Sequence, residues 1–248
     1  GATGSGKSTT LASMLNYRNE NATGHILTIE DPLEFLHAHK LSVVDQREVG
    51  IDTHSYEEAL KNALREAPDV IMIGEIRDRN TMKQAIAYAE TGHLCLSTLH
   101  ANNANQAMER VINFFPEEAH RQLLVDLSLN LAGVVSQRLI PGLHEKLVPA
   151  VEVMLNSSYI SDLIAKGEFS GIKEAMARST EIGMCTFDQA LYQLYTEDRI
   201  SLDEALHNAD SRTDLALRIR LAAGVSTQDA GDLSIDTSSP IQSAARLA

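Results

Sequence analysis

The stretch Gly1-Ala2-Thr3-Gly4-Ser5-Gly6-Lys7-Ser8 opens the chain and matches the pattern G-x-x-x-x-G-K-[ST] of a phosphate-binding loop, or P-loop. Glycines at these positions let backbone N–H groups wrap the phosphates of a nucleotide. The Lys7 ammonium can reach the β- and γ-phosphates, and the Ser8 hydroxyl can ligate Mg²⁺. The alternative is a flexible glycine-rich segment, and the motifs farther along the chain count against it. We therefore predict a nucleotide-binding loop formed by Gly1, Thr3, Gly4, Ser5, Gly6, Lys7, Ser8 and Thr9.

The P-loop lies at the very start of the sequence. A P-loop normally follows a buried strand that aims it, and neither such a strand nor an initiator Met precedes Gly1. We therefore expect an N-terminally truncated piece of a larger protein, without the first strand of its sheet. Since that strand would be central and buried, we expect its loss to leave unpaired strand edges and an apolar slot. We also expect the fragment to fold poorly and to lack ATPase activity.

The composition is that of an ordinary globular protein. Of the 248 residues, 44% are hydrophobic and 22% are charged, which suits one large α/β domain or such a domain with a helical annex. The longest apolar runs, such as 70–73, are far short of a membrane span, so membrane contact is expected only through partners. Cys95 and Cys185 form no ligand pattern, so we expect reduced thiols and no zinc. A net charge of −13 disfavours a nucleic-acid partner.

Apolar periodicity after the P-loop alternates between helices and strands. It predicts strands over 25–30, 43–46, 70–73 and 94–98, and helices over 7–17, 55–66, 82–89, 103–114 and 117–135. Such alternation is typical of a mostly parallel sheet with helices on both faces. The sequence therefore predicts an α/β fold built around a P-loop core.

The pattern changes in the second half of the chain. A hairpin is predicted from 137–140 and 147–154, and the residues beyond 156 read as short helices only. Two of these helices open with the capping boxes Thr186/Gln189 and Ser201/Glu204. From residue 224 onward there is little periodicity, which indicates disorder. The predicted domains are a core over 1–155, a small helical C-terminal subdomain over 156–223 and a disordered tail over 224–248.

Carboxylates and histidines stand at the ends of three predicted strands. The stretches are Glu30-Asp31-Pro32-Leu33-Glu34, Gly74-Glu75 and Ser97-Thr98-Leu99-His100, with His93 just before the third strand. Open parallel sheets place their ligand site at the carboxyl ends of the strands. Nucleotide hydrolysis needs carboxylates there to hold Mg²⁺ and polarise water. Each feature alone has a plainer explanation as a solvated turn or a structural histidine, but their conjunction behind a P-loop favours a functional site.

Four motifs resemble, in order and spacing, the four boxes of the secretion ATPase superfamily. They are Gly-Ala-Thr-Gly-Ser-Gly-Lys-Ser-Thr at 1–9, Thr-Ile-Glu-Asp-Pro-Leu-Glu at 28–34, Asp-Val-Ile-Met-Ile-Gly-Glu-Ile-Arg-Asp at 69–78 and Thr-Gly-His-Leu-Cys-Leu-Ser-Thr-Leu-His at 91–100. That superfamily calls them the Walker A, Asp, atypical Walker B and His boxes. The resemblance covers about residues 1–222 and looks strongest to the type IV pilus retraction ATPases, the PilT/PilU family.

Shorter stretches look more like the PilU branch of that family. They are Gln-Arg-Glu-Val-Gly at 46–50, Ser-Gln-Arg-Leu-Ile at 136–140 and Cys-Thr-Phe-Asp-Gln-Ala-Leu at 185–191. Where the PilT branch carries an Ala-Ile-Arg-Asn-Leu type motif, this chain departs from it with Ile-Lys-Glu-Ala-Met at 172–176.

The resemblance implies a RecA-like core that binds ATP and Mg²⁺, and it implies roles for single residues. Glu75 would polarise the attacking water, and Glu34 would help Ser8 organise the metal, partly through water. His93 and His100 would couple the γ-phosphate to neighbouring elements. The catalytic residues implied are Glu75, Glu34, His100, His93 and Arg110, the last as a charge-stabilising arginine near a subunit interface.

The resemblance also implies partners and a location. The family works as a homohexamer with an N-terminal PAS-like domain, which this sequence lacks. Its members act in the cytoplasm at the bacterial inner membrane, with a pilus platform protein and a second retraction ATPase, to power pilus retraction and twitching motility. Three alternatives stay open. They are a pilus assembly or type II secretion ATPase, which typically carries a tetracysteine zinc module, a small-molecule P-loop kinase and a non-hydrolysing accessory subunit.

Overall fold

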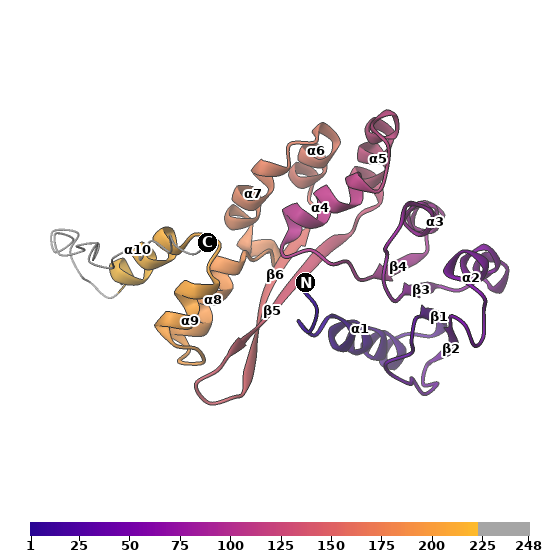
Figure 1. Ribbon diagram of the computed structural model, residues 1–248, viewed down its shortest axis with the longest axis horizontal. Coiled ribbons are helices and arrows are strands. Elements are labelled where there is room, and N and C mark those ends of the chain that lie inside the picture. Colours follow the sequence, from indigo (N-terminus) through magenta and orange to yellow (C-terminus); the bar gives the residue numbers. More distant parts are fainter. Residues whose placement is uncertain (223–248) are drawn as a thin grey trace, which may run out of the picture.

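A four-stranded parallel sheet forms one half of the molecule (Figure 1). The computed structural model describes residues 1–222, so the tail predicted over 224–248 lies outside the described residues. The strand order is β2-β1-β3-β4, and all three pairings are parallel. This confirms the predicted α/β class. The strands are β1 (Gly24–Glu30), β2 (Ser42–Glu48), β3 (Val70–Ile73) and β4 (Leu94–Ser97).

Helices cover both faces of this sheet. Along β1, Ile26 packs with α1 (Lys7–Asn21), whereas the next residue, Leu27, packs with α2 (Tyr56–Ala63) and α3 (Arg79–Glu90). This alternation follows from the period of two in a strand. A strand buried from both sides must be apolar along its whole length, as β3 is. Each such large side chain contributes about 1.5–3 kcal/mol when buried.

An antiparallel hairpin follows the parallel sheet. The remaining elements are α4 (Ala104–Asn113), α5 (Glu117–Asn130), β5 (Gly133–Pro141), β6 (Leu147–Leu155), α6 (Ser158–Lys166), α7 (Ile172–Arg178), α8 (Phe187–Thr196), α9 (Leu202–Asn208) and α10 (Arg212–Ala222). Short 3₁₀ turns lie at Leu64–Glu66, Phe169–Gly171 and Thr180–Ile182.

The prediction of one helix over 117–135 was wrong at its end. The chain becomes extended at Leu131, and Gly133 already pairs with Leu155 of β6. The backbone of Val134 and Val135 joins this antiparallel ladder, where β-branched side chains pack well. The predicted caps hold in part. Thr186 and Gln189 form a full capping box, whereas Ser201 accepts the N–H of Glu204 without the return bond.

The hairpin runs between two packed groups of helices (Figure 1). On one side Ile140 and Val148 pack with α8, α9 and α10, which we call the C-terminal helices. On the other side Met154 belongs to the core that includes α6, α7 and the parallel sheet. The predicted division near residue 155 stays a prediction, since α6 and α7 share the core of the sheet.

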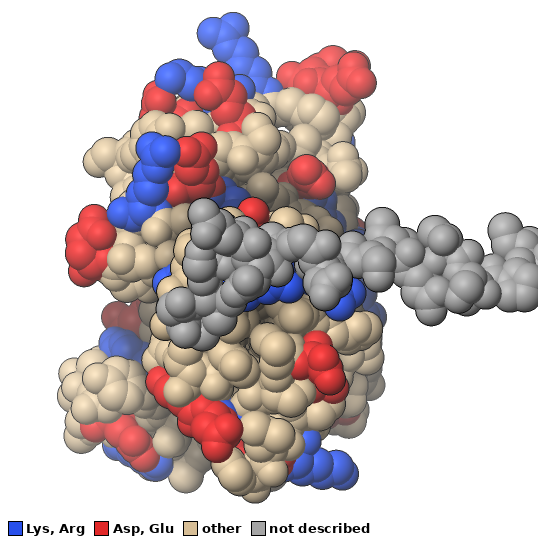
Figure 2. Space-filling view, turned by 90° about the vertical axis from the view of Figure 1, so that its left-hand side faces the viewer, with Lys and Arg blue, Asp and Glu red and all other residues tan. Residues whose placement is uncertain are grey.

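The surface mixes charges of both signs. On the face shown in Figure 2, acidic and basic side chains are interspersed over the C-terminal helices and their neighbours. None of the helices within residues 1–222 has the length and apolar character needed to cross a membrane.

Candidate functional site

The P-loop bends sharply before α1 begins. Gly4 and Gly6 have φ angles of +76° and +85°, in the left-handed region where glycine carries no steric penalty. Gly6 is the N-cap residue of α1, and Lys7 is the first residue of the helix. The unpaired N–H groups and the positive end of the helix dipole therefore face the loop, an arrangement that favours anions.

The Lys7 side chain folds back onto the P-loop. Its Nζ atom donates to the carbonyl oxygens of Gly1 and Ala2, each at 2.9 Å. Burial lowers the pKa of Lys7, while the negative charges of Glu75 and Glu34 act in the opposite direction. The structure thus brings the lysine into electrostatic range of two predicted site carboxylates, although they lie after different strands.

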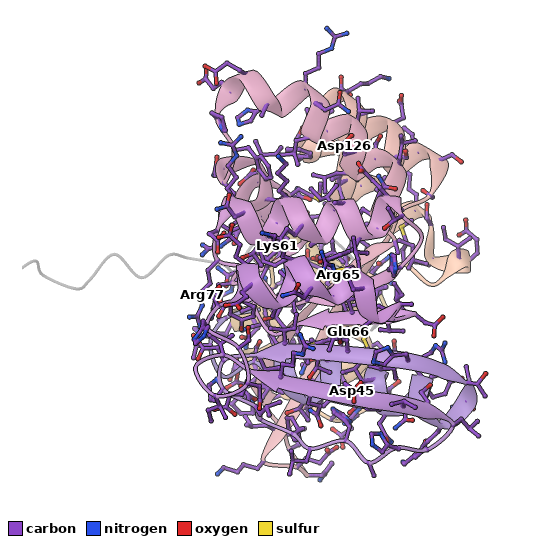
Figure 3. All side chains as sticks on the ribbon, turned by 90° about the vertical axis from the view of Figure 1, so that its right-hand side faces the viewer. Asp45, Lys61, Arg65, Glu66, Arg77 and Asp126 are labelled. Atoms are coloured by element: carbon purple, nitrogen blue, oxygen red, sulfur yellow. The ribbon has the colours of Figure 1, made fainter. Side chains whose placement is uncertain are left out.

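Glu75 and His100 meet where β3 and β4 end. His100 Nε2 lies 3.1 Å from Glu75 Oε1, and Arg77 Nε donates to Glu75 Oε2 at 2.8 Å. Because β3 and β4 are neighbours in a parallel sheet, the residues after them emerge at the same edge. Figure 3 shows Arg77 at the edge toward which the strand arrows point. The Glu75 side chain is 16% exposed, so solvent still reaches the carboxylate.

Two residues of this edge were missed at the level of sequence. One is Arg77, whose pKa is raised by its hydrogen bond to Glu75. The other is Tyr56, whose pKa is raised to about 12, first by burial and then by the charge of Asp31. A side chain at Gly74 would come within 3.3 Å of the Tyr56 hydroxyl. The sequence did contain a signal for Tyr56. This residue directly follows the N-cap Ser55, so it is the first residue of a helix that begins beside the strand ends.

The acidic stretch after β1 divides into a buried and an exposed part. Glu30 is buried and accepts a hydrogen bond from Thr28 Oγ1 at 2.9 Å. Glu34 is exposed, within electrostatic range of Lys7. Within residues 1–222, no group of three or more His, Cys, Asp or Glu side chains is placed to hold a metal ion. The described residues at this edge therefore do not form a metal site from protein ligands alone.

The donors of the P-loop nevertheless fit a magnesium nucleotide. Ser5 Oγ is buried and has no hydrogen-bond partner among the described residues. A buried hydroxyl without a partner is costly, and a phosphate oxygen would satisfy it. Mg²⁺ usually keeps several waters and takes only one or two protein ligands besides phosphate oxygens. Ser8 and the exposed Glu34 would supply these one or two protein ligands.

His93 and Arg110 lie away from this group. His93 precedes β4, and its Nδ1 atom is 3.2 Å from the carbonyl oxygen of Tyr88. The four residues of β4 rise about 3.3 Å each and so place His93 about 13 Å from the end that leads to His100. Arg110 is exposed on α4, with its guanidinium 5.8 Å from the centre of the Phe114 ring. Their predicted roles stay predictions.

An apolar cavity of about 610 Å³ opens beside the P-loop. Leu11 and Met14 of α1, Leu96 of β4 and Val134 of β5 are among its lining residues. Within the described residues, β4 is an edge strand of the parallel sheet, and β5 pairs only with β6. Residues of both β4 and β5 line the cavity, and the loss of a first strand stays a prediction. The other strands of the parallel sheet pair directly with one another.

Comparison with known proteins relates this chain to secretion and pilus ATPases. The sequence profile of the family described as type II/IV secretion system protein matches residues 1–213. The chain is 60% identical to the type IV pilus ATPase PilU of Pseudomonas aeruginosa over 94% of this chain and 61% of that protein. It is 44% identical to the type IV pilus retraction ATPase PilT of the same organism, over 84% of this chain and 61% of that protein.

A solved structure, the pilus retraction motor PilT with bound ADP, superposes with a TM-score of 0.81. Its sequence is 41% identical, and the match covers 88% of this chain and 62% of that chain. The likeness shows that the parallel sheet and its helices have the RecA-like fold of these ATPases. The chain therefore spans about 61% of the length of these two relatives.

Proposed function

Because this chain belongs to the type II/IV secretion system protein family, we propose that it carries the motor core of an ATPase that powers type IV pilus retraction. The identity of 60% to PilU, against 44% to PilT, supports the PilU branch. The reaction is the hydrolysis of ATP to ADP and phosphate. The observation that carries the proposal is the contact of Glu75 with His100 at a strand end from which the charge of Glu75 reaches Lys7 of the P-loop.

Lys7 and the start of α1 bind the phosphates. The two carbonyl oxygens that accept from Lys7 are neutral, whereas phosphate oxygens are charged and form stronger hydrogen bonds with an ammonium. A bound nucleotide therefore draws the Lys7 ammonium away from Gly1 and Ala2. The N–H groups of the loop and the α1 dipole stabilise the same negative charge.

Glu75 is the group that accepts a proton from the attacking water. Its Oε1 atom faces His100 and its Oε2 atom faces Arg77, so the carboxylate is held in one orientation. Orientation matters, since a general base must reach the water within about 2.6–3.2 Å. His100 contacts Glu75 through its Nε2 atom, and the residue follows β4 at the same edge of the sheet. We propose that His100 senses the γ-phosphate through its contact with Glu75.

Ser8 and Glu34 would hold Mg²⁺, Glu34 partly through water. The ion would supply positive charge that offsets the negative charge of the phosphates. Arg110 is exposed on α4, where a charge-stabilising role would require a neighbouring subunit. This agrees with the homohexamer that we propose.

The remaining parts of the proposal concern the whole protein. We propose a cytoplasmic hexamer at the inner membrane that contacts the pilus platform protein and a second, PilT-like retraction ATPase. A pilus assembly or secretion ATPase is the second candidate, and a non-hydrolysing accessory subunit is the third. Deletion of the gene separates the first two, because loss of retraction leaves cells with excess pili and loss of assembly leaves cells without them.

Hydrolysis is tested with the purified full-length protein. Phosphate release from ATP is measured with and without Mg²⁺ in the wild type, in Lys7→Ala and in the control Lys83→Ala, an exposed lysine of α3. We expect Mg²⁺-dependent turnover in the wild type and the control, and loss of nucleotide binding in Lys7→Ala. Nucleotide binding by the wild type without any turnover would favour the accessory subunit.

A further inference from the structure

Gln137 of β5 holds the P-loop from a distant part of the chain. Its Nε2 atom donates to the carbonyl oxygen of Ser5 at 2.8 Å, and its Oε1 atom accepts from Thr10 Oγ1 at 2.7 Å. The amide thus spans the end of the loop and the first turn of α1. It also packs against Gly6, where an added Cβ would lie 2.8 Å from Nε2. Only an amide of this length supplies a donor and an acceptor at these two places.

Arg138, the next residue, faces the C-terminal helices. Its guanidinium donates to the carbonyl oxygen of Asn208 at 2.6 Å and to Asp210 Oδ1 at 2.7 Å. The same group lies 3.8 Å from the centre of the Phe187 ring, at the start of α8. Neighbouring side chains of a strand point to opposite faces, so one peptide unit connects two separate surroundings. Asp210 also pairs with Lys173, at 3.3 Å, and its side chain is largely buried.

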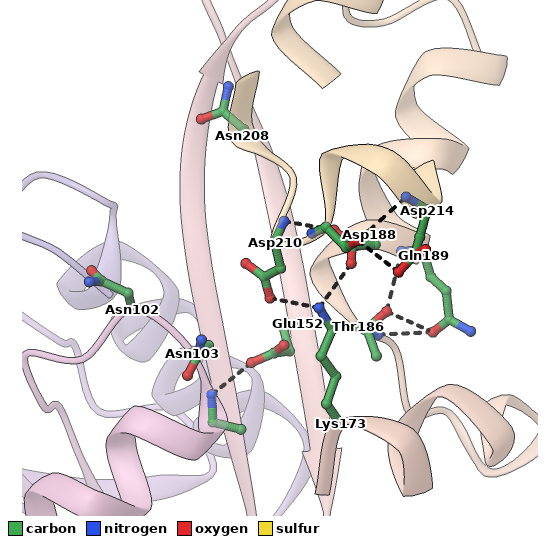
Figure 4. A network of polar contacts seen from close by, with 12 residues as sticks. Asn102, Asn103, Glu152, Lys173, Thr186, Asp188, Gln189, Asn208, Asp210 and Asp214 are labelled. Atoms are coloured by element: carbon green, nitrogen blue, oxygen red, sulfur yellow. Dashed lines mark hydrogen bonds and ion pairs between the residues drawn. The ribbon is translucent and has the colours of Figure 1, made fainter. Parts of the chain in front are cut away.

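A third connection joins the hairpin to α4. It involves Ser136 and Glu152, which pair across the hairpin. Glu152 is 2% exposed and accepts the N–H of Ala104, the first residue of α4, at 2.7 Å (Figure 4). Burial raises the pKa of Glu152, while the bonds from Ala104 and Ser136 oppose that shift. Because α4 begins four residues after His100, the pair Ser136 and Glu152 is also connected to the strand end that carries His100.

We propose that Gln137 and Arg138 link the P-loop to the C-terminal helices, so that nucleotide binding and the packing of α9 and α10 are thermodynamically coupled. This inference rests on the proposed function. Gln137 acts here as a positioning residue, because it touches the loop and not the nucleotide. The hairpin is paired from Gly133↔Leu155 to Pro141↔Leu147, so a shift of Gln137 carries Arg138 with it. Coupling of this kind is reciprocal, and each event must change the free energy of the other.

The test uses the purified full-length protein and a fluorescent ADP analogue. Gln137→Met keeps the length of the side chain and removes both hydrogen bonds, and Thr10→Val removes one partner while Gln137 stays. The control is Gln122→Met, since Gln122 is an exposed residue of α5 whose side chain donates to Asp126. We expect the Kd for the analogue to rise about three- to tenfold in Gln137→Met and by less in Thr10→Val. The double variant should resemble Gln137→Met alone, and the Gln122→Met control should bind as the wild type does.

Hydrogen exchange of the amides in α9 and α10 gives a second readout. In the wild type, saturating ADP should change their exchange rates by about threefold or more, and this response should vanish in Gln137→Met. Arg138→Lys keeps the charge but cannot donate to both Asn208 and Asp210, so it should also abolish the response. The control Arg178→Lys, in an exposed ion pair with Glu174, should keep it.

Outcomes that contradict the inference are distinct from those that contradict the proposed function. A wild-type protein that binds no nucleotide overturns both. A wild type that binds ADP, together with a Gln137→Met variant whose Kd and exchange response are unchanged, overturns the inference alone. If Gln137→Met fails to fold, Thr10→Val and Arg138→Lys decide: normal affinity in the first and a normal response in the second reject the coupling.

Discussion

The Nε2 atom of His100 lies 3.1 Å from Oε1 of Glu75, and this contact joins the ends of two neighbouring parallel strands. The opposite oxygen of Glu75 is held by Arg77, whose side chain is 63% exposed. An ion pair so open to water contributes little to stability, whereas the half-buried contact with His100 is screened less. The two oxygens of Glu75 therefore have separate partners, Arg77 on the solvent side and His100 on the neighbouring strand end.

Glu75→Gln should bind nucleotide but scarcely turn it over. Glutamine keeps the shape of the side chain but cannot take a proton from water, and loss of a general base costs about 10²–10⁴ in rate. Phosphate release and nucleotide affinity are both measured. The matched control is Glu90→Gln, since Glu90 is an exposed residue of α3. Near-normal turnover in purified Glu75→Gln would remove Glu75 from the assigned role.

His100→Ala should lower kcat about tenfold with little change in KM. The variant leaves the P-loop intact and removes the 3.1 Å contact of Nε2 with Oε1 of Glu75, and loss of one polar contact to a charged group costs about this much. His100→Gln can still donate to Glu75 and should retain more activity than His100→Ala. Steady-state kinetics of both variants check this, and equal kcat values in His100→Ala and the wild type would refute it.

Gly6→Ala should weaken both folding and nucleotide binding. At φ +85° a side chain costs about 1–2 kcal/mol, and its Cβ would also lie 2.8 Å from Gln137 Nε2. Gly50→Ala is the matched control, because Gly50 has φ +88° with nothing within 4 Å of the added Cβ. Urea unfolding should show a larger loss of stability for Gly6→Ala. Equal losses in the two variants would mean that the close approach of Gln137 has no energetic weight.

Glu152→Gln should make stability less dependent on pH. Burial raises the folded-state pKa of Glu152 above its ordinary value of 4.5. The stability that this group contributes is then fully present below pH 4.5 and is lost as the pH rises through the raised pKa. Glutamine can still accept the N–H of Ala104 and carries no charge. The free energy of unfolding of the wild type relative to Glu152→Gln should therefore fall as the pH rises from 4.5 to 7.5.

The matched control for this comparison is Glu145→Gln, since Glu145 is exposed. Its stability relative to the wild type should show a smaller pH dependence than that of Glu152→Gln. Parallel stability curves for Glu152→Gln and the wild type would show that Glu152 is not perturbed in the folded state.

Local sequence was enough to predict the parallel sheet and its site edge. The apolar run of β3 predicts a buried strand, and the carboxylates and the histidine mark where the strands end. Both patterns depend only on residues that are neighbours in the sequence. Parallel pairing then brings the ends of adjacent strands together, so Glu75 and His100 could be expected near each other. The end of α5 could not be predicted, since helical periodicity continues past Leu131 and only pairing with β6 makes that segment extended.

The sequence by itself determined the α/β class, and it predicted both the P-loop and the position of the acidic residues at one edge of the sheet. Only the tertiary structure decided that Gln137 holds Ser5 and that Arg138 holds Asp210. Ser5 and Gln137 are 132 positions apart, and no local pattern encodes such a contact. It arises because the hairpin and α1 dock on the same core, and docking depends on the packing of the whole chain rather than on any one segment.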